Sequence, residues 1–369
     1  RKRNILIVRL DEIGDVVMTS GFLRELRRNY SNSRITLIVK PQTINLVEKC
    51  PYVDDTHNYD PGSNKPLRPF FSRLWRSFQL MQNHIWKRKY DLAIHPRWGV
   101  DSSFGTILAG LSRAEHRVGY SENVNPAKRK YNKGFNYLLT DSIDARAIKH
   151  EVEHNYNILR HLGCEVNDES LELWLTNEDH ECANRILGEH GVKSKEIIFA
   201  FGVGAGSPRR MWSIDRYLQV AEWVIDEFSA RIIVVGGEED QPSGEYLRNN
   251  LEDQVINLTG KTTLRQSGAI LERCNLFIGN DSGPMHLAAA VGTPVIEISC
   301  HPEDGDPGAP NSPVRFGPWG VPRIIIQPHQ AISPCISSCQ SQQPHCIREV
   351  NIEKVQMAVE ELLQERVLS

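Results

Sequence analysis

Short runs of apolar residues alternate with longer amphipathic stretches along most of the chain. An uninterrupted apolar run such as 4–8 or 34–39 is typical of a strand buried on both faces of a parallel sheet, whereas 13–30 carries apolar residues at helical spacing. Further strands are predicted at 91–94, 117–119, 196–201, 231–235, 255–258, 276–279 and 294–298. Because strands and helices alternate, the sequence predicts an α/β protein built from two consecutive series of βαβ units.

The rest of the pattern sets the expected domain boundaries. Residues 141–180 show no clear strand, a linker is expected near 165–195, and 301–334 is rich in Pro and Gly and is expected to be loop. We therefore expect an N-terminal domain at 1–175, a C-terminal domain at 176–345, and at 346–369 a final helix that can cross back to the first domain. The other helices are predicted at 43–50, 150–162, 213–228, 263–273 and 284–291.

Length and composition agree with a two-domain globular protein. The 369 residues exceed one ordinary core, and the hydrophobic content of 40% and charged content of 24% are typical of folded chains. The net charge of -3 gives no field that favours nucleic acid. No apolar run reaches the roughly 20 residues of a membrane span, and no signal-peptide pattern opens the chain. A cytoplasmic protein is expected, with a peripheral contact to the inner membrane surface as a further option. The basic run 86–90 fits a solvated helix end or a contact with an anionic acceptor or a membrane.

The segment 277–290 carries the strongest local signal for a binding site. A buried strand ends there, a tight polar turn follows, and a helix begins with a Pro, which suits a first helical turn. The backbone N–H groups of Ser282 and Gly283 can bind an anion at the positive end of that helix, and His286 falls in the same first turn. The alternative is that Asp281 and Ser282 only cap the helix and that His286 is a surface residue.

The first strand leads into a second candidate site. Three carboxylates, Asp11, Glu12 and Asp15, crowd the loop after this strand, and Gly14 relaxes its backbone. A carboxylate at the carboxyl end of a strand can act as a general base, although Asp15 can equally be a helix N-cap. Contacts with an acceptor are expected from the same half of the chain, at Gly14, His95, Arg97 and the basic stretch 68–89.

Two loops in the second half add candidate ligand contacts. The Gly-rich segment 204–212, which includes Gly206, precedes a helix, and its Arg210 can clamp a pyrophosphate by charge and paired hydrogen bonds. It lacks the Gly-Lys-Ser/Thr ending of a Walker loop, which excludes that type of ATPase, and a flexible surface turn is the alternative. Glu238 follows the strand at 231–235 and can hold a ribose hydroxyl, or lie in an exposed acidic turn.

Three of the eight cysteines gather near the C-terminus: Cys335, Cys339 and Cys346, with His345 beside the last. Their spacing lacks the two close pairs of a standard zinc site. A cytosolic setting disfavours a stable disulfide without excluding it. A metal site, a disulfide and unconnected thiols are therefore open alternatives, and a structural or adventitious role is favoured over a functional metal.

Taken together, these segments resemble glycosyltransferase family 9, the ADP-heptose lipopolysaccharide heptosyltransferase family. The motifs that carry the resemblance lie at 7–17, 204–212 and 279–294, and it extends over nearly the whole chain. It implies a GT-B fold, in which two Rossmann-like domains face each other across a cleft. It also implies sugar transfer with inversion at the sugar carbon, with no required metal or other cofactor. Many relatives carry a C-terminal cysteine cluster similar to the one described above.

The resemblance implies a role for several residues. Asp15 matches the loop aspartate that is proposed as general base in the family. Arg210 stands where the family usually has a lysine before a Trp, which keeps the positive charge and changes its geometry. The donor-phosphate loop of the family matches Asp281, Ser282, Gly283 and His286.

The sequence therefore predicts an inverting glycosyltransferase. It would move heptose or a related sugar from a nucleotide-diphosphate sugar similar to ADP-heptose to a glycan, glycolipid or lipopolysaccharide-type acceptor. Two alternatives are a sugar-nucleotide epimerase of the same fold, which releases a free product, and a non-catalytic nucleotide-sugar-binding protein. The crowded carboxylates of the N-terminal loop favour an enzyme, because a binding protein needs no base there.

Overall fold

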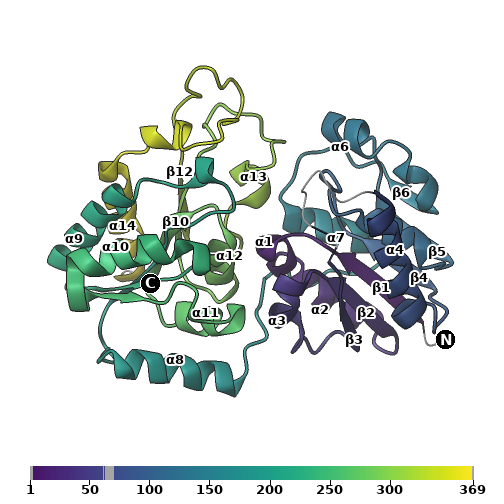
Figure 1. Ribbon diagram of the computed structural model, residues 1–369, viewed down its shortest axis with the longest axis horizontal. Helices are drawn as coiled ribbons and strands as arrows, with labels where there is room; N and C mark the ends of the chain where they lie inside the picture. Colours follow the sequence, from purple (N-terminus) through teal and green to yellow (C-terminus); the bar gives the residue numbers. More distant parts are fainter. Residues whose placement is uncertain (1–2, 61, 63–69, 368–369) are drawn as a thin grey trace. The chain divides into compact units, whose positions relative to one another are not determined.

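The chain folds into two compact units, each built around one parallel sheet (Figure 1). The computed structural model describes residues 3–60, 62 and 70–367. Unit 1 spans Arg1–Glu169 and unit 2 spans Ser170–Ser369. The predicted α/β class with two Rossmann-like sheets is confirmed.

Unit 1 holds a six-stranded sheet in the order β3-β2-β1-β4-β5-β6. Its strands are β1 (Asn4–Arg9), β2 (Arg34–Val39), β3 (Asp55–Asn58), β4 (Leu92–His95), β5 (His116–Tyr120) and β6 (Asp141–Ile143). Its helices are α1 (Ile13–Val17), α2 (Ser20–Asn29), α3 (Ile44–Val47), α4 (Phe70–Leu80), α5 (Gly105–Leu111), α6 (Pro126–Tyr131) and α7 (Glu151–His161). The central strands β1 and β4 are almost fully buried, which explains their unbroken apolar runs.

Unit 2 repeats this topology, with the order β12-β11-β10-β7-β8-β9. Its strands are β7 (Ile198–Gly202), β8 (Arg231–Val234), β9 (Val255–Asn257), β10 (Leu276–Asn280), β11 (Val295–Ile298) and β12 (Arg323–Ile326). Its helices are α8 (Asn177–Glu189), α9 (Ile214–Phe228), α10 (Gln241–Leu251), α11 (Leu264–Leu271), α12 (Gly283–Ala290), α13 (Pro313–Phe316) and α14 (Ile352–Val367). Helix α14 packs against α9, β11 and β12, so it belongs to unit 2.

Both sheets share the strand order of dinucleotide-binding folds. In each, the order reverses beside the first strand, between β1 and β4 in unit 1 and between β7 and β10 in unit 2. Ligands of such sheets bind outside the carboxyl ends of the two strands that flank the reversal. The topology therefore directs attention to the loops after β1 and β4, and to the loops after β7 and β10.

Several local predictions were wrong. Residues 177–189, expected within a linker, form helix α8, whose buried stripe Asp179, Ala183 and Leu187 packs toward α11. Strand β6 lies in a region expected to lack strands, and β12 lies in the predicted loop 301–334. Both are short strands at the edge of a sheet. Strand β6 is mostly polar, whereas β12 carries three consecutive isoleucines that the Pro- and Gly-rich composition around them obscured. Within the described residues, every helix is too short or too polar to span a bilayer.

Candidate active site

A single buried amide organises the reversal point of unit 2. Asn280, the last residue of β10, donates through Nδ2 to the carbonyl oxygens of Val203 at 2.8 Å and Gly204 at 3.3 Å. Its Oδ1 accepts hydrogen bonds from the Trp212 backbone N–H at 3.1 Å and the Tyr217 hydroxyl at 3.0 Å. Asn280 thereby fixes the Gly-rich loop that follows β7 against the residues that lead into α12.

The start of α12 presents hydrogen-bond donors. Ser282 is the residue before the first helical turn, yet its side chain does not cap the helix, and its Oγ is buried without a hydrogen-bond partner. The N–H groups of the first helical turn lack intrahelical acceptors, and the helix dipole adds positive potential there. The arrangement suits an anion bound by Ser282 and Gly283. His286, one turn into the helix, is only 5% exposed, so the alternative of a surface histidine is wrong.

A charged pair lies next to this helix start. Arg210 Nη1 stands 3.3 Å from Asp281 Oδ2, while Arg210 Nε has no hydrogen-bond partner. Glu297, in β11 beside Gly279, is fully buried. Burial, and then the negative charge of Asp281, raise the pKa of Glu297 well above its ordinary value. The raised pKa disfavours a second negative charge beside Asp281. Sequence reasoning missed Glu297, although a Glu inside an apolar strand was a usable signal.

The acidic turn after β8 holds one exposed and one buried acid. Glu238 is exposed at the start of a short 3₁₀ turn, Glu238–Asp240. Asp240 is buried, accepts a hydrogen bond from the Gly237 N–H at 2.9 Å, and packs against Gly204, where any side chain would collide with it. Gly206, by contrast, faces open space, so packing does not require glycine there.

In unit 1 the reversal point is a network of ion pairs. Arg97 Nη1 donates to Asp15 Oδ1 at 2.9 Å, and Arg9 Nη2 lies 3.3 Å from the same oxygen. Asp11 contacts both arginines, at 3.4 Å from Arg97 Nη1 and 3.3 Å from Arg9 Nη1. Asp15 is the third residue of α1 and accepts a hydrogen bond from the Glu12 N–H, so the alternative of an N-cap Asp15 is wrong.

The arginines hold the Asp11 carboxyl group as an anion. Burial opposes ionisation of Asp11, but the charges of Arg97, Arg9 and His95 outweigh it and keep the pKa of Asp11 below its ordinary value. The carboxylates in turn raise the pKa of Arg97 despite its burial. Asp15, at 8% exposure, is thus an oriented carboxylate at the carboxyl end of the sheet, with Gly14 buried beside it.

His95 has a structural environment. Its side chain is 2% exposed, with Nδ1 3.0 Å from the Val8 carbonyl oxygen and Nε2 3.3 Å from Asp101 Oδ2. Gly105 packs so closely on the imidazole that a side chain there would collide with it. Of the expected acceptor contacts, Arg97 belongs to the ion-pair network of Asp11 and Asp15. His95 is buried against Val8 and Asp101, and Arg68 lies outside the described residues.

Lys128 joins the same network and was not anticipated. Its Nζ donates to the Arg97 carbonyl oxygen at 2.6 Å, and the side chain is almost fully buried. Burial lowers the pKa of Lys128 to about 7. The local sequence, a basic stretch at 128–130 in α6, gave no sign that one of its lysines points inward.

Comparison with known proteins identifies the family of the chain. The family model for glycosyltransferase family 9 (heptosyltransferase) matches residues 81–345. The chain belongs to glycosyltransferase family 9. The match includes the loops after β4, β7 and β10, and begins after Asp15.

Relatives of this family 9 glycosyltransferase support the same assignment. Lipooligosaccharide heptosyltransferase 2 of Haemophilus influenzae is 25% identical over 80% of this chain and 82% of its own length. A family 9 glycosyltransferase of Veillonella parvula aligns with a TM-score of 0.80 at 23% identity, over 98% of both chains. An E. coli heptosyltransferase solved with ADP-2-deoxy-2-fluoro heptose aligns with a TM-score of 0.68 at 15% identity, over 97% of this chain and 99% of that one. The structural likenesses show a shared fold.

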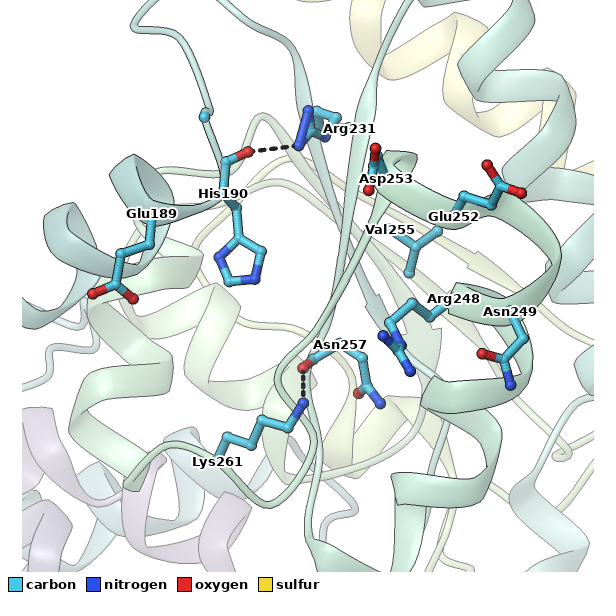
Figure 2. A pocket seen from close by; sticks show the side chains of 11 residues that line it. Glu189, His190, Arg231, Arg248, Asn249, Glu252, Asp253, Val255, Asn257 and Lys261 are labelled. Atoms are coloured by element: carbon cyan, nitrogen blue, oxygen red, sulfur yellow. Dashed lines mark hydrogen bonds between the residues drawn. The ribbon is translucent and has the colours of Figure 1, made fainter.

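Figure 2 shows a large hollow of this glycosyltransferase in unit 2, lined by residues between Glu189 and Lys261. It has a volume of about 990 Å³, and Arg231 and Lys261 at its rim are already engaged with the carbonyl oxygens of His190 and Asn257. Its lining mixes three basic with three acidic side chains, Arg231, Arg248, Lys261, Glu189, Glu252 and Asp253. None of the predicted donor-binding residues lines it.

Proposed function

We propose that this glycosyltransferase moves heptose or a closely related sugar from a nucleotide-diphosphate donor similar to ADP-heptose to a lipopolysaccharide-type glycan acceptor. The observation that carries the donor half is the start of α12, where Ser282 Oγ is buried without a partner and Arg210, whose Nε is also unpartnered, pairs with Asp281. The first turn of a helix offers backbone N–H donors to an anion. The relatives named as heptosyltransferases, and the one solved with an ADP-heptose analogue, support the choice of donor.

The proposed reaction inverts the anomeric centre. The acceptor hydroxyl oxygen attacks the anomeric carbon, the bond from that carbon to the diphosphate oxygen breaks, and Asp15 takes the hydroxyl proton. Ser282, Gly283 and Arg210 stabilise the departing diphosphate, with His286 and Asp281 beside them. Because negative charge on the leaving oxygen grows toward the transition state, these contacts strengthen as the reaction proceeds. The proposed chemistry places no metal or other cofactor at the reacting atoms.

A donor panel tests the proposal. The protein is incubated with ADP-heptose, other ADP-sugars and UDP-sugars, each with and without a heptose-lacking lipopolysaccharide core acceptor, and products are read by mass spectrometry. Acceptor-dependent transfer of heptose is expected, with ADP released. Steady formation of an epimer without acceptor would replace the proposal with an epimerase. Tight donor binding without turnover on any acceptor would favour a binding protein.

We further propose that the acceptor is a glycolipid met at the cytoplasmic face of the inner membrane. In α4, Trp75 is 62% exposed and Phe78 41% exposed, and their rings stack with centroids 6.1 Å apart. Arg76 lies between them in the sequence, and exposed aromatic rings beside basic side chains suit a membrane interface. Replacing Trp75 and Phe78 by Ser should reduce cosedimentation with anionic vesicles and leave transfer to a delipidated acceptor intact. Unchanged cosedimentation would remove this part of the proposal.

A further inference from the structure

The loop between β12 and α14 brings four potential metal ligands together. Sγ of Cys335, Cys339 and Cys346 and a ring nitrogen of His345 all lie within 4.8 Å of one another. Cys339 and Cys346 are buried in the core of unit 2, while Cys335 and His345 are half-buried. The sequence indicated this group and left a metal site, a disulfide and unconnected thiols open. The loop folds back so that Cys335 meets His345, ten positions later.

The distances match a tetrahedral ion. Cys335 Sγ lies 3.6 Å and Cys346 Sγ 3.5 Å from His345 Nδ1. A zinc ion with bonds of about 2.3 Å to sulfur and about 2.0 Å to nitrogen places a sulfur and a nitrogen ligand about 3.5 Å apart. The cysteines are free thiols, whereas a disulfide would join two sulfurs at about 2.0 Å. The cluster therefore has the dimensions of an ion site.

The ligand atoms limit which ions this cluster can bind. Three sulfurs and one imidazole favour zinc or a mononuclear iron over magnesium or calcium, which prefer oxygen. The Gln340 backbone N–H donates to Cys335 Sγ at 3.4 Å, a contact of the kind that orients metal-bound sulfur. Four protein ligands fill a tetrahedron and leave no position for water or substrate, which is typical of a structural site.

The segment that follows the cluster touches the proposed donor loop. The turn Cys346–Glu349 contacts the turn Pro208–Arg210. Beyond it, the Val350 carbonyl oxygen accepts hydrogen bonds from Trp212 Nε1 at 2.9 Å and Arg216 Nη1 at 2.5 Å. A cavity of about 590 Å³ lies between these two segments, lined from both sides by residues such as Met211 and Ile347.

We propose that Cys335, Cys339, His345 and Cys346 bind one zinc ion, which fixes the loop that supports Arg210 and the rest of the donor site. Binding replaces the thiol protons, which are released to solvent. The supporting role rests on the proposed function, whereas the zinc site itself does not, because metal content can be measured without donor or acceptor.

The test measures metal in the full chain, purified under reducing conditions without a metal-affinity tag. Plasma mass spectrometry should find about one zinc per chain, and cobalt substitution should give the absorption of tetrahedral cobalt with sulfur ligands. Cys335→Ser and His345→Asn, at the half-buried positions, should each weaken zinc binding at least about tenfold in competition with a chromophoric chelator. Cys182→Ser, a cysteine in α8 outside the cluster, is the matched control and should retain the zinc.

The outcomes separate the existence of the metal site, the identity of the ion and the role of the ion in donor binding. No bound metal after reconstitution, zinc retained in both ligand variants, or a disulfide within the cluster would overturn the site. Mononuclear iron in place of zinc would keep the site and overturn the choice of ion. Zinc removal should weaken donor binding about tenfold, with recovery on readdition. Unchanged donor binding in zinc-free protein would overturn the supporting role alone, and a zinc-loaded protein that binds no nucleotide sugar would contradict the proposed function alone.

Discussion

The two units share the point at which the strand order reverses, but the side chains there differ in charge. In unit 1, the loops after β1 and β4 are joined by ion pairs, in which Arg9 and Arg97 hold the carboxylates of Asp11 and Asp15. In unit 2, the loops after β7 and β10 are joined by the neutral amide of Asn280, and donors at the helix start are left without partners. The first arrangement offers an oriented carboxylate, and the second offers sites for an anion. We therefore propose that one strand order serves proton transfer in one unit and phosphate binding in the other.

The largest effect should come from removing the carboxylate in unit 1. Asp15→Asn keeps the shape and the Arg97 contact but cannot accept a proton at neutral pH, so kcat should fall by roughly 10²- to 10⁴-fold. Donor affinity, measured by calorimetry, should stay within about threefold. Glu12→Gln is the matched control, because Glu12 is exposed, and the variant removes its charge and its ion pair with Lys40 while keeping the backbone N–H that donates to Asp15. A loss of donor binding in Asp15→Asn, with kcat preserved, would contradict the proposal that Asp15 is the base and that unit 2 binds the donor.

A second prediction concerns the stability of the unit 1 network. The folded pKa of Lys128, about 7, is below the ordinary value of 10.5, so the unfolded chain binds more protons between these pH values. Stability should therefore rise with pH through that window, by roughly 1.4 kcal/mol per pH unit from this residue, and the penalty is fully present below pH 7.

Lys128→Met should lack this rise. Urea unfolding at pH 7, 8.5 and 10 would show the wild-type and variant curves converging as pH increases, while the exposed Lys130→Met should follow the wild type. Other groups also titrate in this range, so the quantity of interest is the difference between wild type and variant. Parallel curves for wild type and Lys128→Met would mean that the buried amine does not titrate near neutrality.

Lys128 also illustrates what the sequence could not provide. The apolar runs of β1, β4, β7 and β10 predicted the central strands, since burial on both faces leaves an unbroken pattern. Those strands led directly to Asp15 and to the Ser282 loop. Which polar side chains turn inward depends on contacts between distant segments, as in the bond from Lys128 to the Arg97 carbonyl oxygen.

Some strands and helices at the edges of the two units could not be predicted, because their sequences lack a strong apolar pattern. Strand β3 is Asp-Thr-His-Asn, half-buried at most, so it carries no apolar run. Helix α8 buries only a narrow stripe and is otherwise exposed, which made its sequence look like a linker. For the cysteine cluster, the sequence supplied the four residues, but the choice between a metal site and a disulfide required the path of the loop that brings Cys335 to His345.

In unit 2, the positive charge of Arg210 should matter most. Arg210→Met removes hydrogen bonds to the diphosphate and leaves Asp281 beside it, so donor affinity should fall about ten- to a hundredfold. Arg210→Lys should lose less, because the charge is kept. The double variant Arg210→Met with Asp281→Asn should recover part of the loss if repulsion contributes. Calorimetric titration with ADP measures all three. Equal affinity in wild type and Arg210→Met would exclude Arg210 from the donor site.

The smallest expected effect distinguishes the two acids after β8. If the exposed Glu238 holds a ribose hydroxyl, Glu238→Gln should weaken ADP binding by about fivefold, which corresponds to one hydrogen bond of roughly 1 kcal/mol. The affinity for deoxyribose analogues of ADP should not change. Asp240→Ala should instead lower the unfolding free energy by about 1 kcal/mol, because Asp240 accepts the Gly237 N–H and packs on Gly204. Its effect on affinity should be the same for ADP and its deoxy analogues. The reverse pattern, with ribose sensitivity at Asp240, would mean that the buried acid contacts the nucleotide and that the Gly-rich loop opens to admit it.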